Sequence, residues 1–557
     1  MHRFASSLFL GALLAMPATA AFAQERVTVA GVEATRVVIA PPQTELARII
    51  KSGLATSYQS AGRDGRAYEQ SRQLYFFYGA RHFEPLWLSE GPDGAVAFSP
   101  MAERIIDVFE AAELEGFRPS DYLTDALDVA AAGRDPQRLA DLETAFSAAV
   151  VRYAQDAYGG RVSPREVYST WTLEPKRLDE ATLLMELAAS DAPDRILLDL
   201  SPKHREFAQL KSALAKFYDG SVIDAAVTIP EGLMLRPGMQ DERVPLLRQR
   251  LDVPEPEIPE TAGAEAEGNI TYDEALVEAV KAFQESLGLT VDGITGPATV
   301  AALNGGSATT KEDIIANMER WRWAPDDLGE FHVAVNIPEF RLTIMNEGQP
   351  HYTTRVVVGT ARHQTPVFSD EIEHVVVNPY WNVPASIASN EIAPALVRNP
   401  WYLDGQNMEL LYGGKLVNAA AVDWTTTSIR NFHVRQRPGA GNALGRIKFL
   451  FPNQHDVYLH DTPSKSLFQR SFRAYSHGCV RVQNPMEFAD ALLEFEPELT
   501  GASLEGMFGS KERWVNLDTH IPVHISYYTL RVDDDGTIRS YADVYGHHRR
   551  LIELLAL

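Results

Sequence analysis

The residues best suited to chemistry lie in the segment SHGCVRV, residues 476–482. It holds Cys479, the only cysteine among 557 residues, so the chain cannot form an internal disulfide. A lone cysteine is usually a buried and inert side chain. Here the polar, basic side chains of His477 and Arg481 favour the reactive thiolate, and Gly478 lets the backbone come close to a ligand. We therefore interpret Cys479 as a candidate nucleophile.

A thiol nucleophile needs a base, and His460 is the candidate. It ends a predicted strand, DVYLH, and residues 461–475 form a connection long enough to bring Cys479 back to face it. A neutral imidazole within hydrogen-bond reach can take the thiol proton. This requires an acceptor for the other ring nitrogen, either a backbone carbonyl or Asp461. His477 is the alternative base, but it lies too close to Cys479 in the chain to swing freely onto the sulfur.

Neighbouring groups complete the predicted site. We expect Ser476 and His477 to orient the turn, and backbone N–H groups near Gly478 and Cys479 to hold the oxyanion of a tetrahedral intermediate. The planar guanidinium of Arg481 suits a carboxylate. Tyr458 lies two residues before His460, hence on the same strand face, where it either lines the cleft or packs in the core.

A zinc site is the competing interpretation, because His460, His477 and Cys479 are zinc-ligand types. Structural zinc sites need four ligands, however, and catalytic ones show tighter spacings. The acids at 533–535 precede Gly536 and are typical of a turn rather than a calcium site. The sequence therefore predicts neither a metal nor a cofactor.

The charge distribution indicates the kind of substrate. The net charge of −24 makes general nucleic-acid binding improbable. From 430 to 481, nine Lys or Arg residues against two Asp residues give a formal +7. Either this basic segment meets an anionic substrate or it is a solvated face. The nine are Arg430, Arg435, Arg437, Arg446, Lys448, Lys465, Arg470, Arg473 and Arg481.

The first residues have the layout of a secretory signal, with Arg3, an apolar run over 8–16, and small residues at Ala21 and Ala23. We expect a signal peptide over 1–23 and an exported protein; an uncleaved N-terminal anchor is the alternative. Since no other stretch approaches about 18 uninterrupted apolar residues, we expect no membrane span after it.

The elements that must position the site belong to a multidomain α+β chain. Residues 45–230 show mainly helical periodicity and predict a scaffold domain. Strand-like alternation marks residues 313–550, interrupted by a helical, loop-rich insertion over about 386–429. Near the end, residues 523–545 contain two alternating runs joined by an Asp-Gly turn, which predicts a hairpin.

Between these regions, residues 235–304 form a small helical unit around an acidic loop, 254–268, whose composition cannot bury a core. The stretch AVKAFQESLGL followed by VDGITGPATVAAL resembles a peptidoglycan-binding domain of the three-helix type. The resemblance implies that this unit binds glycan strands.

The site residues carry a second resemblance. His460 and SHGCVR, with NPYWNVP (378–384), RQRPGAGNALGRIKFLFPN (435–453) and YLHDTP (458–463), are similar to the large Gram-negative L,D-transpeptidases with a YkuD-type β-sandwich domain. The resemblance implies that Cys479 is the nucleophile and His460 the base. Many members have Asn two residues after the cysteine, where this chain has Arg481.

What the family implies about function follows from that likeness. It implies a periplasmic enzyme that makes 3-3 cross-links in peptidoglycan from tetrapeptide stems through a Cys thioester. It further implies inhibition by carbapenems, and other wall-synthesis enzymes are candidate partners. The insertion resembles a capping subdomain, in which we expect Trp424 to offer an apolar wall and Arg435 a positive charge to the substrate.

Two other functions remain open from the sequence. With water as the acceptor, the same thiol would make a carboxypeptidase, or a hydrolase of wall-protein linkages. A non-catalytic peptidoglycan-binding scaffold is the third hypothesis, although a pure binding protein would not need both His460 and Cys479.

Overall fold

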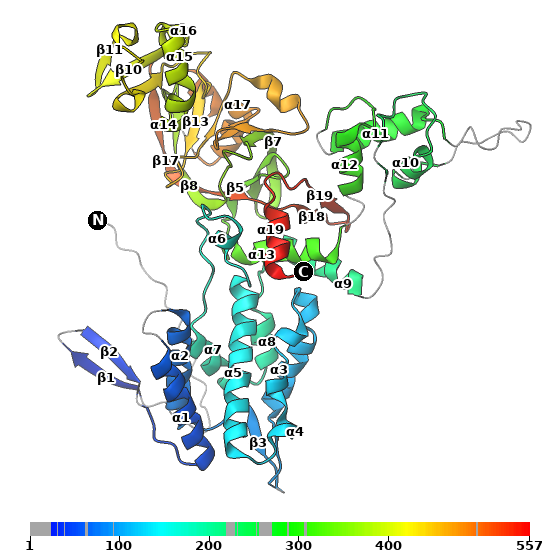
Figure 1. Cartoon of the computed structure of the whole chain (residues 1–557), viewed down its shortest axis with the longest axis vertical. Coiled ribbons are helices and arrows are strands. Elements are labelled where there is room, and N and C mark those ends of the chain that lie inside the picture. Colours follow the sequence, from blue (N-terminus) through cyan, green and yellow to red (C-terminus); the bar gives the residue numbers. More distant parts are fainter. Residues whose placement is uncertain are drawn as a thin grey trace, which may run out of the picture. The chain divides into compact units, whose positions relative to one another are not determined.

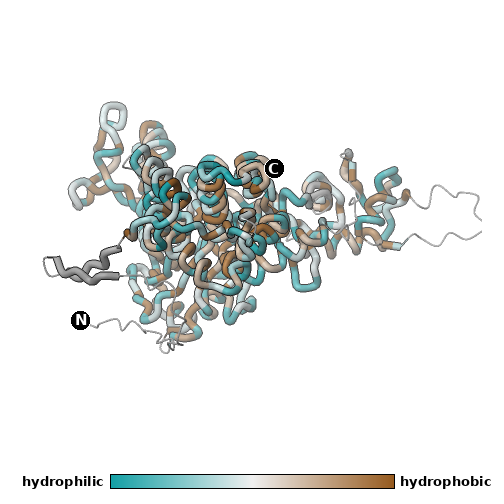
Figure 2. The backbone as a smooth tube through the Cα atoms, turned by 90° about the horizontal axis from the view of Figure 1, so that it is seen from below, coloured by the Kyte–Doolittle hydropathy of each residue, from teal (hydrophilic) through white to brown (hydrophobic). Residues whose placement is uncertain are grey.

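The computed structural model describes residues 24–29, 32–37, 39–61, 65–92, 94–218, 229–230, 232–251, 253–254, 270–286, 289–305, 309–496 and 499–557. The predicted signal peptide and all but the first residue of the acidic loop lie outside them. Within these ranges no helix is long and apolar enough to span a membrane; Figure 2 shows hydrophobic and hydrophilic residues mixed along the chain. The chain divides into two compact units, Met1–Tyr158 with Arg177–Ser201, and Gly159–Lys176 with Pro202–Leu557.

The first unit is mainly helical, as predicted for the scaffold (Figure 1). In α3, Ser99 caps the N-terminus by accepting from the Ala102 N–H, and Ile105 and Phe109 are fully buried on one face. The elements are β1 (Gln24–Val29), β2 (Val32–Val37), α1 (Glu45–Ser60), α2 (Arg66–Ala80), β3 (Leu88–Glu90), β4 (Val96–Phe98), α3 (Pro100–Glu110), α4 (Val129–Ala132), α5 (Pro136–Gly159), α7 (Glu180–Ala189) and α8 (Pro193–Leu198).

Two segments of the predicted scaffold region pack in the second unit instead. The short helix α6 (Pro164–Val167) and the following Trp171 join the apolar core of the main sheet. Helix α9 (Arg205–Tyr218) packs on α13 (Lys311–Trp323) through Phe207. Like the helices of the scaffold, these segments are apolar on one face. Periodicity therefore could not predict which part of the chain covers that face.

The small helical unit has the three helices expected of it, α10 (Val244–Arg250), α11 (Glu274–Ser286) and α12 (Pro297–Gly305). Leu247, Leu276, Val280 and Leu303 are buried in its own core. The three helices therefore share an apolar core of their own.

The catalytic region is built on a nine-stranded sheet with the order β15-β7-β16-β14-β13-β8-β17-β5-β6. An additional β6–β7 pairing folds the sheet back on itself around one core. Helices α17 (Pro485–Leu492) and α18 (Gly501–Glu505) contribute to that core. The strands are β5 (Phe331–Asn336), β6 (Arg341–Asn346), β7 (Gln349–Gly359), β8 (Phe368–Val377), β13 (Ile447–Leu450), β14 (Leu459–His460), β15 (Ala474–Ser476), β16 (Val480–Val482) and β17 (Arg513–Ser526).

The two ends of this region differ from the prediction. Residues 311–323 form the buried helix α13, so the strands begin only at Phe331. The predicted hairpin over 523–545 is shorter, because residues up to Ser526 belong to β17; only β18 (Leu530–Val532) pairs with β19 (Ile538–Ser540) across the Asp-Gly turn. The chain then forms α19 (His547–Leu555).

The insertion forms a cap with a core of its own. Four strands pair in the order β11-β10-β12-β9, so the cap contains a small sheet besides the predicted helices. It closes where Asn382 of β9 pairs with Arg435 of β12. Its elements are β9 (Trp381–Asn382), α14 (Ala385–Ile387), a π-helical turn (Ala388–Ile392), α15 (Ala393–Arg398), α16 (Tyr402–Gly405), β10 (Met408–Tyr412), β11 (Lys415–Val417) and β12 (His433–Gln436).

Candidate active site

The sheet brings the predicted nucleophile and base to one face. Strands β14 and β16 lie side by side and parallel, with His460 opposite Arg481. Since side chains alternate between the faces of a strand, Tyr458 shares the face of His460, and Cys479 shares that of Arg481. The connection over 461–475 therefore returns the chain as the sequence predicted.

The ring of His460 is held in one tautomer. Its Nδ1 lies 2.5 Å from the backbone carbonyl of Asp461, and because a carbonyl can only accept, Nδ1 donates the proton. This is one of the two acceptors expected from the sequence. The side chain is buried. Its Nε2 is left as the acceptor, which is the state that a base requires.

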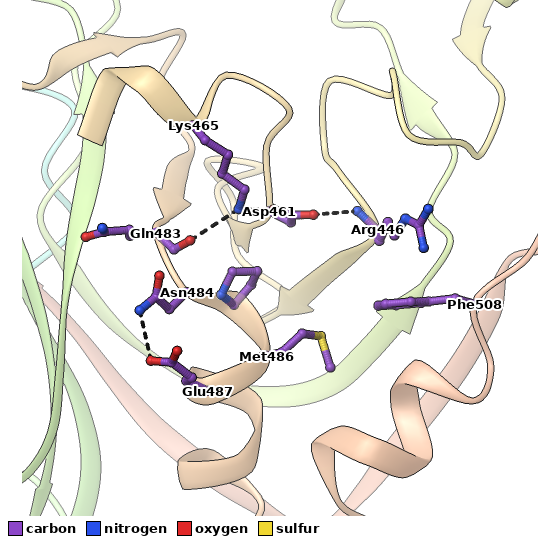
Figure 3. Close-up of a pocket in the computed structure, with 9 residues that line it drawn as sticks. Arg446, Asp461, Lys465, Gln483, Asn484, Met486, Glu487 and Phe508 are labelled. Carbon is purple, nitrogen blue, oxygen red and sulfur yellow. Dashed lines mark hydrogen bonds and ion pairs between the residues drawn. The ribbon is translucent and has the colours of Figure 1, made fainter. Parts of the chain in front are cut away.

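Asp461 is itself fixed from its other side. Its carboxylate accepts from the Arg446 backbone N–H at 2.9 Å and from the Lys465 ammonium at 2.6 Å. These groups line a pocket of about 340 Å³ at the ends of β14 and β16 (Figure 3). Gly445, at φ +62°, leaves no room for a side chain, since a Cβ there would overlap the Asp461 carboxylate. Asp461, whose backbone carbonyl positions the His460 ring, is therefore tightly packed against Gly445.

The turn before Cys479 is held by internal hydrogen bonds. Ser476 Oγ donates to the Cys479 carbonyl at 2.5 Å and accepts from the Gly478 N–H at 3.1 Å. Gly478, at φ +118°, presents its carbonyl to the Thr365 hydroxyl at 2.7 Å. Ser476 thus lies where an orienting residue would. The Gly478 N–H is already used, however, which corrects the expectation that it helps to hold an oxyanion.

His477 points to the cap instead of the thiol. Its Nε2 lies 3.0 Å from the carboxylate of Glu391, which belongs to the π-helical turn. The His363 ring lies against it, with centroids 4.7 Å apart. This contact links the cap to the residue two positions before the nucleophile.

Burial keeps the resting thiol and imidazole neutral. It raises the pKa of Cys479 to about 11, although hydrogen bonds from Tyr458 and the charge of Arg481 act in the opposite direction. Burial, and next the charge of Arg481, lower the pKa of His460 to about 3. At neutral pH the pair is therefore thiol and imidazole, not thiolate and imidazolium.

This charge state predicts the pH dependence of thiol alkylation. Only the thiolate reacts, so the rate with iodoacetamide should rise about tenfold per pH unit between about pH 7 and 10, with no plateau at neutral pH. The measurement is the loss of free thiol followed by mass spectrometry. A rate that is already constant from about pH 6 would mean that a thiolate–imidazolium pair exists at rest.

Lys448 lies on the same face, and sequence reasoning counted it only as part of the basic segment. It pairs across β13 and β14 with His460 and is 8% exposed. Its ammonium lies 5.5 Å from the centre of the Tyr458 ring and 5.6 Å from that of Trp514. The alternation in IKFLF could have placed it, since Ile447 and Phe449 face the core and Lys448 must face the other way.

Two predicted substrate contacts have other partners. Arg435 binds the buried Glu409 at 2.6 Å and stacks on Tyr380 with its guanidinium carbon 4.3 Å from the ring centre. Arg437 binds the same carboxylate. Trp424 is buried in the cap core and donates to the Ala419 carbonyl at 2.8 Å. Trp424 therefore supports the cap, and we no longer expect it to offer a wall to substrate.

A third predicted contact, Arg481, has no ion pair within the part of the chain that the structure describes, and its Nε is buried without a partner. Among the same residues no three His, Cys, Asp or Glu side chains group closely enough to hold a metal ion. Arg481 and Lys448 are thus two cations on the face of Cys479 that form no ion pair among the described residues.

A cysteine beside a histidine whose free nitrogen can accept its proton defines a cysteine-dependent acyl-transfer site. Three family descriptions match the chain: L,D-transpeptidase catalytic domain at residues 330–504, "Putative peptidoglycan binding domain" at 265–303, and Scaffold domain at 72–214. Residues 330–504 therefore belong to the L,D-transpeptidase catalytic domain family of the YkuD type, and the resemblance predicted from the sequence is confirmed.

Individual proteins are similar to the chain as well. A Haemophilus influenzae protein named "Putative L,D-transpeptidase" is 35% identical over 253 residues, which are 44% of this chain and 50% of that protein. The chain thus spans about half the length of this relative. Crystal structures of L,D-transpeptidases from Xylanimonas cellulosilytica and Stackebrandtia nassauensis are 17% and 14% identical; the matches cover 53% and 52% of this chain and 99% and 94% of theirs, with TM-scores of 0.19 and 0.22.

Proposed function

We propose that the protein is a periplasmic L,D-transpeptidase that forms 3-3 cross-links in peptidoglycan through a thioester on Cys479. The observation that carries the proposal is the His460 ring, whose Nδ1 is bonded to the Asp461 carbonyl while Nε2 stays free on the face that holds Cys479. The match of a peptidoglycan-binding domain supports the same substrate. The signal-like first residues support the location.

In the first step the donor stem acylates Cys479. Its sulfur attacks the carbonyl at the L-centre of the third stem residue while Nε2 of His460 takes the thiol proton. Since the pKa of the resting thiol is raised and that of the imidazole is lowered, a thiolate–imidazolium pair is unfavourable, and we expect the proton transfer to accompany C–S bond formation. The C–N bond to the terminal D-Ala then breaks, and His460 returns the proton to the leaving amine.

In the second step the thioester is passed to an acceptor. The side-chain amine of another stem attacks the acyl carbon and gives its proton to His460, and the sulfur leaves and recovers it. The stems carry carboxylates. Arg481 and Lys448 form no ion pair among the described residues, although Glu512 acts on Lys448 through charge, and they give the site the positive charge that such a substrate requires.

The test is incubation of the purified protein with tetrapeptide muropeptides, followed by mass analysis of the products. Cross-linked dimers and released D-Ala are expected. Tripeptides alone would overturn the cross-linking proposal and make the protein a hydrolase on the same stems. If the muropeptides remain unchanged, the hypothesis of a non-catalytic peptidoglycan-binding scaffold would be favoured.

The cap provides a further prediction. Because Asn382 pairs with Arg435, residues 383–434 can be replaced by a two-residue Asn-Gly turn that joins β9 to β12 and removes the whole cap core. We expect a folded protein whose acylation by muropeptides is about tenfold slower, because the cap contacts His477 through Glu391 and is expected to close over the bound stem.

Circular dichroism and thermal unfolding would establish that the shortened protein folds. The acylation rate of the full chain and of the shortened form is then compared at low and high salt. An equal rate in both forms would show that the cap is not a substrate lid.

A further inference from the structure

Lys448 is a buried charge that forms no ion pair with any of the described residues. Its ammonium has no hydrogen bond and no ion pair among them, although only 8% of the residue is exposed. Glu512 acts on it through charge alone, because its two carboxylate oxygens accept from the Tyr380 N–H at 2.8 Å and the Trp514 indole N–H at 3.3 Å. An unpaired buried charge is unfavourable, so this position is suited to a group that arrives from outside.

The register places this ammonium beside the reacting groups. Trp514 pairs with Val376, Val376 with Lys448, Lys448 with His460, and His460 with Arg481. These residues form one row across the sheet and face the same side, which is also the side of Cys479. Lys448 is therefore separated from the thiol by only one strand, β14.

The walls around the ammonium are aromatic and partly open. Tyr458 and Trp514 hold the cation by their ring faces, which leaves its N–H groups free to donate. Trp514 is 55% exposed, so one wall reaches solvent. A small anionic group can enter on that side without displacing a protein partner.

We propose that Lys448, Tyr458 and Trp514 form a subsite that binds a carboxylate of the donor stem beside Cys479. The inference rests on the proposed function for the identity of the substrate. A free carboxylate close to the scissile bond would bind the ammonium by a charge-assisted hydrogen bond and align the acyl carbon with the sulfur. Among the described residues no hydrogen bond joins the Lys448 ammonium to the Cys479 sulfur; a Cys479 thiolate would act on Lys448 through charge, but the raised pKa of Cys479 keeps the thiol neutral at rest.

The test compares two alkylating reagents that differ by one carboxylate. Iodoacetate carries the negative group and iodoacetamide does not, and both attach to the Cys479 sulfur with loss of iodide. In Lys448→Met the ratio of the iodoacetate rate to the iodoacetamide rate should fall about tenfold, while the iodoacetamide rate stays within about twofold. Lys448→Arg keeps the charge and should retain most of the ratio.

Arg470→Met is the matched control. It removes one positive charge from the same basic segment, but Arg470 is exposed, and its side chain donates to the Tyr475 hydroxyl and stacks on the Tyr475 ring. Its ratio should equal that of the native protein. Thermal unfolding and the iodoacetamide rate report whether Lys448→Met is folded; if it is not, Trp514→Leu, at an exposed position, should lower the ratio about threefold.

Two outcomes would overturn the subsite. One is an unchanged ratio in a folded Lys448→Met protein. The other is an equal fall of both rates with a shifted pH profile, which would make Lys448 a partner of the thiolate. A lowered ratio in a protein that forms no acyl-enzyme with muropeptides would leave the subsite standing and refute the proposed function. If the native protein is acylated by muropeptides but the rate ratio is unchanged in Lys448→Met, the proposed function would stand and the subsite would be refuted.

Discussion

Cys479→Ala is expected to abolish acyl-enzyme formation, with a loss of turnover of more than about 10⁴-fold. The chain has no other thiol, and no second nucleophile is needed to explain the site. The readout is intact-protein mass after incubation with tetrapeptide muropeptides, and separately with a carbapenem, an inhibitor class that the family resemblance implies. The native protein should gain the mass of one acyl group.

Cys479 is half-buried, and its sulfur makes only weak hydrogen bonds, to Tyr458 and to the Asp456 carbonyl at 3.7 Å. The alanine protein should therefore fold like the native one, with the same circular dichroism spectrum and a melting temperature within a few degrees. Cys479→Ser, with a similar volume and a poorer nucleophile, serves as the control. A covalent adduct on the alanine protein would refute the assignment of the nucleophile.

His460→Ala should lower kcat/KM by about 10²- to 10⁴-fold, whereas His477→Ala should lower it less than about tenfold. His460 is buried, and its tautomer is set by the Asp461 carbonyl. The His477 side chain is 43% exposed and pairs with an exposed Glu391, so that ion pair contributes little to stability. Single-turnover acylation rates of the two variants provide the comparison.

The ranking of the two histidines distinguishes their roles. Retained activity in His460→Ala together with a large loss in His477→Ala would mean that the base had been assigned to the wrong histidine. Glu391→Gln is the companion of the second variant, since it removes the charge that His477 faces and leaves the catalytic strands unchanged.

Local patterns in the sequence predicted that His460 and Cys479 lie close together, because the two residues lie on or next to adjacent strands. The strand DVYLH and the motif SHGCVR each carry one reacting group, and an alternating pattern defines which face a side chain occupies. Pairing of β14 with β16 then suffices to bring His460 and Cys479 together. The three-helix unit was predictable for the same reason, since its core is local in sequence.

What the sequence did not predict depends on contacts between distant residues. The sequence predicted that Arg435 binds substrate, but in the fold its guanidinium binds Glu409. It also predicted that Trp424 contacts substrate, but Trp424 is buried in the core of the cap. Helix α9 carries an ordinary amphipathic pattern, and only the fold shows that α13 covers its apolar face. A local hydrogen bond can be missed as well: the bond that the Gly478 N–H donates to Ser476 Oγ could not be predicted from the residue types alone.

Gly445 has a consequence for how relatives of this protein are recognised in genomes. An alanine there would overlap the side chain of Asp461, whose backbone carbonyl sets the tautomer of His460, so we expect a loss of activity although every reacting atom is present. A survey that accepts any sequence with the cysteine and the histidine would count such a pseudo-enzyme as active. A search pattern for active relatives should therefore require a glycine fifteen residues before the histidine, as Gly445 precedes His460 here.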